Sequence, residues 1–149
     1  MNRKGQSTIE FALTALLLLT ILLSVAELAM MFYVNLTMQH AVRQGTRLAI
    51  TGPPGDRRSQ LVQRIKDSSN GLYDKNALPR KDPTVSVLTP TKGFDNYSVA
   101  ETGKPGDIII VSLTYAWPLL TPALKPAFSD GRYTFTVRAT MRNELWERE

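Results

Sequence analysis

Cysteine is absent from the 149-residue sequence, and histidine occurs once, at position 40. Without cysteine, the chain can form no disulfide, no thioether bond to haem and no Cys-based zinc site. His40 stands among Met38, Gln39 and Ala41, with no acid or thiol close by in the sequence. We therefore expect it to be structural or solvated, not catalytic or metal-binding. A small domain of this kind must depend on its hydrophobic core or on neighbouring subunits.

The sequence also lacks the motifs that mark common catalytic and nucleic-acid-binding sites. It contains no G-x-S-x-G, Walker loop or His-Glu-x-x-His motif. Its acidic residues are scattered without the spacing of a calcium loop. The formal net charge is +5, but the basic residues form no dense cluster interleaved with aromatics. We expect no enzymatic activity, no cofactor, no bound metal and no nucleic-acid partner.

Charge is almost missing from one long stretch near the N-terminus. Between Phe11 and Val42 the only formally charged side chain is Glu27, and residues 11–34 are mostly Leu, Ala, Met, Ile and Val. A hydrocarbon core of about 30 Å is crossed by about 20 helical residues. Residues 11–34 therefore predict a single helix that spans a membrane.

Basic residues give this helix an orientation. Arg3 and Lys4 precede the apolar run, whereas the next basic residue, Arg43, lies beyond it. Because positive charge is retained in the cytoplasm, we expect the N-terminus to be cytoplasmic and residues 43–149 to lie outside. A cleaved secretory signal explains the run less well, since its apolar region is only about 7–15 residues long and ends at a small-x-small site.

Just before the apolar run, a glycine follows two basic residues and a carboxylate stands five positions later. This segment, from Lys4 to Phe11, resembles the processing site of type IV pilin-like proteins. The resemblance implies that residues 1–5 are a leader and that a prepilin peptidase cuts between Gly5 and Gln6, which retains the helix. It also implies that Glu10, with Phe11 beside it, sets the register between assembled subunits.

Glu10 has two physical explanations. An ionised carboxylate at the edge of a bilayer is costly unless it is paired. The new α-amino group on Gln6 of a neighbouring subunit would be a natural partner, and it would select the stagger between subunits. Alternatively, Glu10 is an interfacial residue at the start of a helix, stabilised by the helix dipole. The glycine, the spacing and the apolar run occur together, which favours the pilin interpretation.

The helical pattern continues past the membrane. Apolar or small residues recur at three- and four-residue steps from Val34 to Ala49. Gly52 and the prolines after it cannot continue a helix. We therefore expect one helix over residues 6–52.

Two features of this helix make the resemblance to a pilin family more specific. Arg43, Gly45 and Arg47 form an Arg-x-Gly-x-Arg segment that resembles TadE-like minor pilins of tight-adherence pili, and an acid such as Glu27 is found there too. Glu27 could pair with a basic group or polar backbone of an adjacent pilin or of the inner-membrane platform. Alternatively, it lies near the outer leaflet or is protonated, and is simply tolerated. Gly45 either weakens the helix or permits close helix packing. The early proline that these proteins often carry is missing.

Residues 53–149 predict a small head, so that the chain as a whole belongs to the α+β class. A short helix over 56–68, capped by Asp56, is expected to pack on a roughly three-stranded antiparallel sheet, with its basic residues, Arg57 among them, on the solvated face. The strands are predicted over 84–88, 107–117 and 132–142. The second should be central, because Ile108 to Val111 are apolar on both faces.

The connections between the predicted strands are loops of different character. Residues 89–106 are polar and rich in glycine, whereas residues 118–131 carry three prolines among Leu and Phe side chains. The apolar loop should pack over the end of the sheet or contact another subunit. Residues 111–122 and 139–144 also resemble the two C-terminal blocks of TadE-like proteins.

These features together predict a minor pilin or pseudopilin of a bacterial tight-adherence type IV pilus, acting in adhesion, biofilm formation or secretion. It would first lie in the inner membrane with its head in the periplasm, and could then enter an extracellular pilus. The implied partners are the prepilin peptidase, other major and minor pilins, the inner-membrane assembly platform and the lipid bilayer. The alternatives are a signal-anchored periplasmic binding module, which would have no reason to be cut at Gly5, and a secretion-system pseudopilin, which only its partners distinguish.

Overall fold

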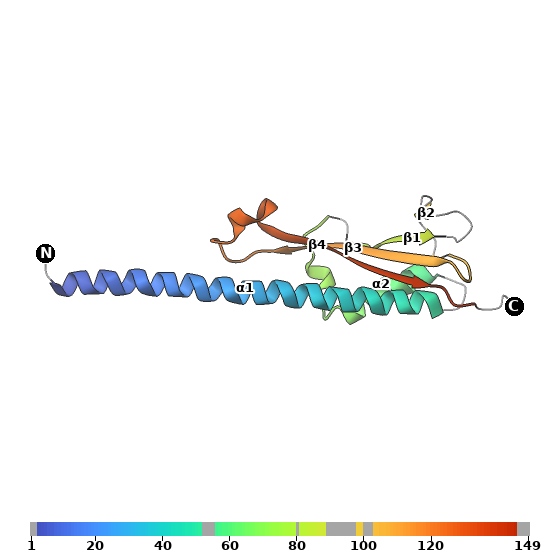
Figure 1. Ribbon diagram of the computed structural model, residues 1–149, viewed down its shortest axis with the longest axis horizontal. Coiled ribbons are helices and arrows are strands. Elements are labelled where there is room, and N and C mark those ends of the chain that lie inside the picture. Colours follow the sequence, from blue (N-terminus) through green and yellow to red (C-terminus); the bar gives the residue numbers. More distant parts are fainter. Residues whose placement is uncertain (1–2, 52–55, 80, 89–97, 100–102, 146–149) are drawn as a thin grey trace.

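The computed structural model describes residues 3–51, 56–79, 81–88, 98–99 and 103–145. One long helix, α1 (Arg3–Thr51), runs through most of the length of the molecule. The head packs along the C-terminal half of α1, while the N-terminal half projects alone (Figure 1). The predicted α+β architecture with a long N-terminal helix is thereby confirmed.

The head places a second helix and a sheet beside α1. Helix α2 (Arg57–Ser68) begins at the predicted residues, and the carboxylate of its N-cap Asp56 accepts a hydrogen bond from the Ser59 backbone N–H at 3.2 Å. Such a bond satisfies one of the amide groups that a helix start leaves open. Short 3₁₀ turns follow at Tyr73–Lys75, and further on at Lys125–Ala127 and Ser129–Gly131.

The sheet is antiparallel, with strand order β2-β1-β3-β4. Its members are β1 (Thr84–Leu88), β2 (Ser98–Val99), β3 (Ile108–Pro118) and β4 (Arg132–Arg142). Strand β3 lies between β1 and β4, as its apolar composition predicted. Strand β2 was expected to be part of a loop, and two residues are too short to show the alternation from which strands are predicted. It adds a fourth strand to the predicted three.

The core lies between one face of the sheet and the two helices. In β3, alternate residues from Ile109 to Tyr115 are buried, and their partners across the ladder include Val137 and Ala139 of β4. From α1, Val34, Met38 and Val42 point into the same cluster. The predicted alternation of β4 is confirmed, because its even-numbered residues are exposed. This packing fixes the head against α1 from about its middle to its end.

Two buried polar groups complete the head beside the sheet. Along β3, the pairing with β1 covers only the first half of the strand. Beside the second half lies the connection after α2, where the Ala77 N–H donates to the Ala116 carbonyl oxygen. There the buried Asn76 side chain accepts hydrogen bonds from the backbone N–H groups of Leu78 and Ala116, at 3.1 and 2.9 Å. The Tyr115 hydroxyl donates to the Leu72 carbonyl. Burial and the charge of Asp74 raise the pKa of Tyr115 to about 12.

Candidate functional site

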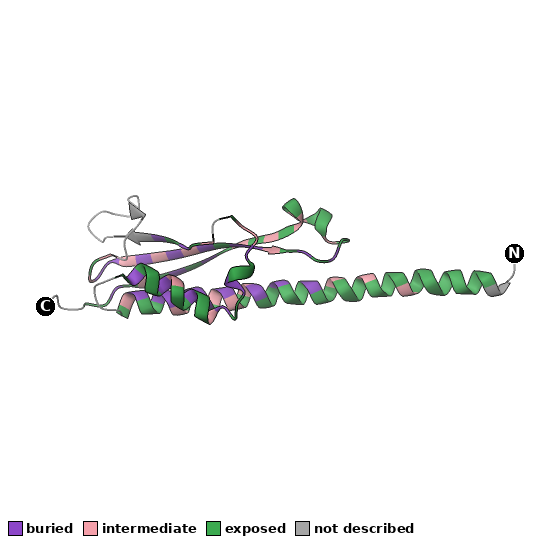
Figure 2. Cartoon of the chain, turned by 180° about the vertical axis from the view of Figure 1, so that it is seen from behind, coloured by how far each residue is buried: buried purple, intermediate pink, exposed green. Residues whose placement is uncertain are grey.

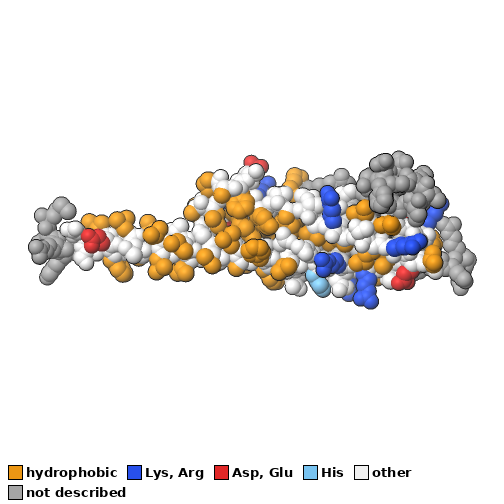
Figure 3. Space-filling model, viewed as in Figure 1, with side chains coloured by type: hydrophobic (Ala, Val, Ile, Leu, Met, Phe, Trp, Pro, Cys, Tyr) orange, Lys and Arg blue, Asp and Glu red, His pale blue; other side chains and the backbone are white. Residues whose placement is uncertain are grey.

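The projecting half of α1 exposes a long apolar surface. Its large hydrophobic side chains from Ile9 to Val25 are all more than half exposed, and Phe11 reaches 74%. Figure 2 shows this half almost uniformly exposed, and Figure 3 shows hydrophobic side chains along it. By length and composition α1 is able to cross a membrane, with its most apolar window free of contacts from the rest of the described chain. The structure is therefore compatible with a single-pass anchor.

The predicted processing segment lies on this projecting helix. Gly5 has open space around it, since a Cβ atom placed there would meet nothing within 4 Å. One turn further on, the Gln6 side-chain amide donates to the Glu10 carboxylate at 3.2 Å, and both side chains are exposed. The structure thus brings Gln6 and Glu10 together on one face of the helix. It leaves Phe11 beside them with no packing partner of its own in the described head.

Glu27 stands where the head first touches α1. Its side chain is only 7% exposed. One carboxylate oxygen accepts a hydrogen bond from the Leu120 backbone N–H at 2.5 Å, and the other accepts from the Thr121 N–H at 2.6 Å. Both donors belong to the loop that connects β3 and β4. We call this arrangement the Glu27 clasp.

The sequence left two explanations of Glu27 open, a contact with an adjacent pilin or the assembly platform, and simple tolerance in the helix. The structure adds a partner that neither explanation included, because the chain's own loop donates to both carboxylate oxygens. A contact between Glu27 and another protein stays a prediction. The apolar loop that contributes these donors correspondingly packs against its own helix, with Leu119 buried.

A second polar contact joins α1 to the same end of the sheet. The Asn35 side-chain amide donates to the hydroxyl of Tyr133, near the start of β4, at 3.1 Å. The Gln39 side-chain amide in turn donates to the side-chain oxygen of Asn35 at 2.7 Å. The Tyr133 ring packs against Phe128 and Phe135. The head is therefore attached to α1 at two places, through Glu27 to the loop and through Asn35 to the strand that follows the loop.

This attachment divides α1 differently from the sequence pattern. The predicted membrane segment, residues 11–34, includes Met31 and Val34, which the head buries at 5% and 0% exposure. The part of α1 that lies before the Glu27 clasp is residues 5–26, about 33 Å long at 1.5 Å per residue. Hydropathy alone could not show this difference, because a core helix and a membrane helix are equally apolar.

Gly45 is a contact point between the two helices. A Cβ atom at this position would lie 2.5 Å from Ile65 Cγ1 and 3.1 Å from the carbonyl oxygen of Leu61, both in α2. The glycine thus allows α2 to approach the α1 backbone closely, as one of its two sequence interpretations proposed. Arg43 and Arg47, its neighbours in the Arg-x-Gly-x-Arg segment, are exposed.

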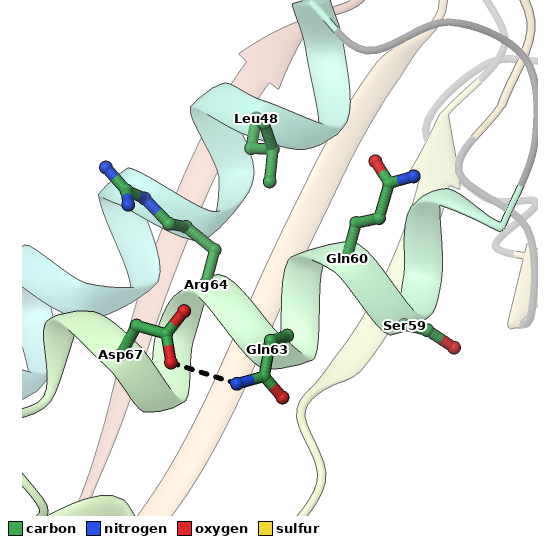
Figure 4. A pocket seen from close by; sticks show the side chains of 6 residues that line it. All are labelled: Leu48, Ser59, Gln60, Gln63, Arg64 and Asp67. Atoms are coloured by element: carbon green, nitrogen blue, oxygen red, sulfur yellow. Dashed lines mark hydrogen bonds between the residues drawn. The ribbon is translucent and has the colours of Figure 1, made fainter.

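An open groove follows the line where α1 and α2 meet. One part of it, of about 610 Å³, is lined by Leu48 of α1 and by Ser59, Gln60, Gln63, Arg64 and Asp67 of α2 (Figure 4). Within it, Gln63 donates to Asp67 at 2.9 Å. Arg64 also borders the adjoining hollow beside Arg47. The groove is shallow and polar, and its geometry does not resemble an enclosed catalytic pocket.

The contacts of Arg57 could not be inferred from the sequence. Arg57 is buried and donates to the carbonyl oxygens of Ala49 and Gly103, at 3.4 and 2.7 Å, so it closes the end of α1. Burial lowers the pKa of Arg57. We had assigned this arginine to the solvated face of α2. The only signal was its place in the first turn, where a cation opposes the helix dipole.

Within the described parts of the chain, no three or more His, Asp or Glu side chains come together in a group that could hold a metal ion. His40 lies on the exposed side of α1, at the edge of a hollow near Tyr33 and Gln44. The expectation of a non-catalytic chain without cofactors remains a prediction.

Comparison with known proteins gives one result. The family model described as TadE-like protein matches residues 5–47. No curated protein and no solved structure matches the chain. The match includes Gly5, Glu27 and the Arg43 to Arg47 segment, and it ends before α2. The part of the chain that is similar to the TadE-like family is therefore residues 5–47, which comprise the projecting helix, the Glu27 clasp residue and the Gly45 contact.

Proposed function

We propose that this chain is a minor pilin or pseudopilin of a bacterial tight-adherence pilus. The observation that carries the proposal is the division of α1 in a TadE-like segment. Residues 5–26 project beyond the head with mostly apolar, mostly exposed side chains, while the second half of the helix is fixed in a small folded head. Such a subunit can be held in a membrane by one half and present the other half outside.

The free half of α1 suits both stages of this function. In the bilayer its apolar side chains would face lipid tails, which are as apolar as leucine. In a fibre the same side chains would pack against helices of other subunits. No change of fold is needed between the two environments, because the Glu27 clasp and the Gly45 contact lie outside the free half.

Gly5 and Glu10 would act at the start of this helix. We propose that a prepilin peptidase cuts after Gly5 on the cytoplasmic side. The open space around Gly5 is compatible with access by a protease. Glu10 is exposed, so that its carboxylate could meet the new α-amino group of a neighbouring Gln6 and set the stagger. The hydrogen bond from the Gln6 side chain would keep Glu10 oriented in the meantime.

The partners and location follow from the same proposal. The subunit would wait in the inner membrane with a cytoplasmic N-terminus and a periplasmic head, in contact with the assembly platform. It would then join other pilins. A secretion-system pseudopilin would share every one of these structural features, and an anchored periplasmic module would share all except the cut.

Fractionation of sheared pili tests the assembly step. We expect the chain to be found in the sheared pilus fraction of cells with active prepilin peptidase, and to be missing from that fraction when Glu10 is replaced, as in Glu10→Ala. The matched control is Thr14→Ala, which alters the same face of the helix one turn on. Equal recovery of both variants would contradict a register function for Glu10. Loss of secretion without any chain in sheared pili would favour the secretion-system pseudopilin.

A further inference from the structure

The loop between β3 and β4 turns one apolar surface outward at the membrane end of the head. Leu119 and Thr121 are buried, but Leu120 between them is 79% exposed, which is among the highest values of any large apolar side chain described. Other apolar side chains of the loop are exposed or half-buried: Pro122, Ala123, Leu124, Pro126, Ala127 and Phe128. An outward-facing leucine in a folded loop is unfavourable in water, at about 25 cal/mol per Å² of apolar surface.

This surface is continuous with the free half of α1. Figure 3 shows hydrophobic side chains extending from the projecting helix onto the end of the head that overlies it. The Glu27 clasp holds the loop on one face of α1. Leu23 lies one helical turn before Glu27 on that same face, and it is exposed. The loop therefore begins where the lipid-facing helix surface ends.

Helix length places this loop at the outer edge of a bilayer. If the charged Glu10 stays at the inner boundary, the hydrocarbon core begins at Phe11. About 20 residues at 1.5 Å each are needed to cross about 30 Å. The core then ends near residue 30, which is beyond Glu27. At this depth a carboxylate must be hydrogen-bonded, and the clasp provides both bonds.

The polar side chains of the loop fit the same location. Lys125 stands exposed in the middle of the loop, and Arg132 stands exposed where β4 begins. Both could reach lipid phosphates while their stems follow the apolar surface. Phe128 and Tyr133 pack edge to face beside them, and aromatic side chains are common at membrane interfaces. Asp130 is the one acid of the loop, and it is exposed beside Arg132.

We infer that the β3–β4 loop, residues 119–131, is a second membrane contact that inserts Leu120 into the outer-leaflet interface and lies on phospholipid headgroups. The inference rests on the proposed anchoring of α1 in a bilayer. Two contacts with the same membrane would fix both the depth of the helix and the tilt of the head. The head would then be held at a set orientation until the subunit leaves the bilayer.

Depth-dependent fluorescence quenching tests this inference. Because the chain contains no cysteine, Leu120→Cys provides a single site for an environment-sensitive dye in the full-length protein. The labelled protein is reconstituted in phosphatidylethanolamine and phosphatidylglycerol vesicles that contain lipid with a nitroxide either near the headgroup, to quench a probe at the interface, or on the acyl chain, to quench a probe in the hydrocarbon core. Two matched variants accompany it. Leu18→Cys reports insertion of α1, and Ser59→Cys reports the exposed side of α2, away from the loop.

We expect the Leu18 and Leu120 probes to be quenched and their emission to be blue-shifted. The loss of fluorescence at Leu120 should be at least about twofold larger than the loss at Ser59. Quenching at Leu18 without quenching at Leu120 would overturn the loop contact while leaving the anchor intact. No quenching at Leu18 would overturn the anchor, and the loop contact with it. A blue shift at Leu120 that depends on protein density but not on nitroxide lipid would assign the loop to a second protein copy instead, which also overturns the inference.

Discussion

Glu27 and Leu120, which are 93 positions apart in the sequence, are joined through the carboxylate of one and the backbone N–H of the other. The neighbouring Thr121 N–H binds the second carboxylate oxygen. An acidic residue within an apolar helix thus binds the loop between β3 and β4. The clasp explains how an acid is accommodated in this helix, and it defines where the free part of α1 begins.

Replacement of Glu27 by glutamine tests the clasp. Glu27→Gln keeps the size of the side chain but turns an NH₂ group toward a backbone N–H, which leaves one donor without an acceptor. Loss of a hydrogen bond to a charged group costs about 1.5–3 kcal/mol. We expect the amides of Leu120 and Thr121 to exchange hydrogen at least about tenfold faster, since 1.4 kcal/mol corresponds to a factor of ten.

The comparison for Glu27→Gln is made within the same protein. Amides in the middle of β4, such as that of Val137, should keep their wild-type protection because they lie in the β3–β4 ladder. Uniform acceleration across the head would show that Glu27 supports the whole fold and not the loop. Unchanged exchange at both loop amides would refute the clasp.

Substitution at Gly45 tests the close approach of α1 and α2. In Gly45→Ala the new Cβ would lie 2.5 Å from Ile65 Cγ1 and 3.1 Å from the Leu61 backbone oxygen. Overpacking of this kind costs about 1–3 kcal/mol, whereas alanine improves helix propensity by up to about 1 kcal/mol. We expect a net loss of stability and a lower Tm in thermal unfolding followed by circular dichroism in detergent.

Gly5→Ala is the matched control, because the same change at Gly5 meets no atom within 4 Å. It should leave the Tm unchanged or slightly higher. If Gly45→Ala is as stable as Gly5→Ala, then the helices can separate without cost and the close packing is not required.

Local patterns were predictable from the sequence, whereas contacts that depend on the whole fold were not. The alternation in β4 was readable, because one face of that strand meets the core and the other meets water. The N-cap at Asp56 is a local signal and was predicted correctly. The partner of Glu27 was not readable, since it depends on the folding of the entire head back onto α1. The head also buries Met31 and Val34, whose composition is typical of a membrane helix.

Substitution of Asn76 tests how the connection after α2 is held beside the second half of β3. In Asn76→Ala the backbone N–H groups of Leu78 and Ala116 lose their acceptor. An unsatisfied buried N–H costs about 1–3 kcal/mol, so we expect a lower midpoint in urea unfolding. Asn70→Ala, at an exposed position after α2, is an imperfect control because Asn70 has a positive φ of 51°. Asn70→Gly, which relieves that conformation, is the better comparison, and its free energy of unfolding should stay within about 0.5 kcal/mol of the wild-type value.

Alkaline pH should destabilise the head through Tyr115. Its pKa is raised to about 12 in the folded chain by burial and by the charge of Asp74, against about 10 in an unfolded chain. The folded state therefore retains the proton while the unfolded state loses it. Stability should be unaffected by this group below pH of about 10 and fall between about 10 and 12, by up to about 1.4 kcal/mol per pH unit.

Urea unfolding at a series of pH values measures this dependence. Tyr115→Phe should be less stable than the wild type at neutral pH, because the hydrogen bond to Leu72 is lost. Its stability should fall less steeply above pH of about 10. Tyr73, which donates to Asp82, also has a pKa raised by burial, so part of the slope should remain. Identical slopes for both proteins would contradict the role of Tyr115.

The central claim of the proposal is that this chain, whose residues 5–47 match the TadE-like family model, enters the pilin pathway by cleavage after Gly5. The most direct measurement is the intact mass of the protein from native membranes, with and without prepilin peptidase, for the wild type, Gly5→Leu and the control Ser7→Ala. We predict the mass of residues 6–149 for the wild type and for Ser7→Ala only when the peptidase is present, and the uncut mass for Gly5→Leu. If the wild type retains residues 1–5 while the peptidase is active on another substrate, the account is contradicted and an anchored periplasmic module becomes the better explanation.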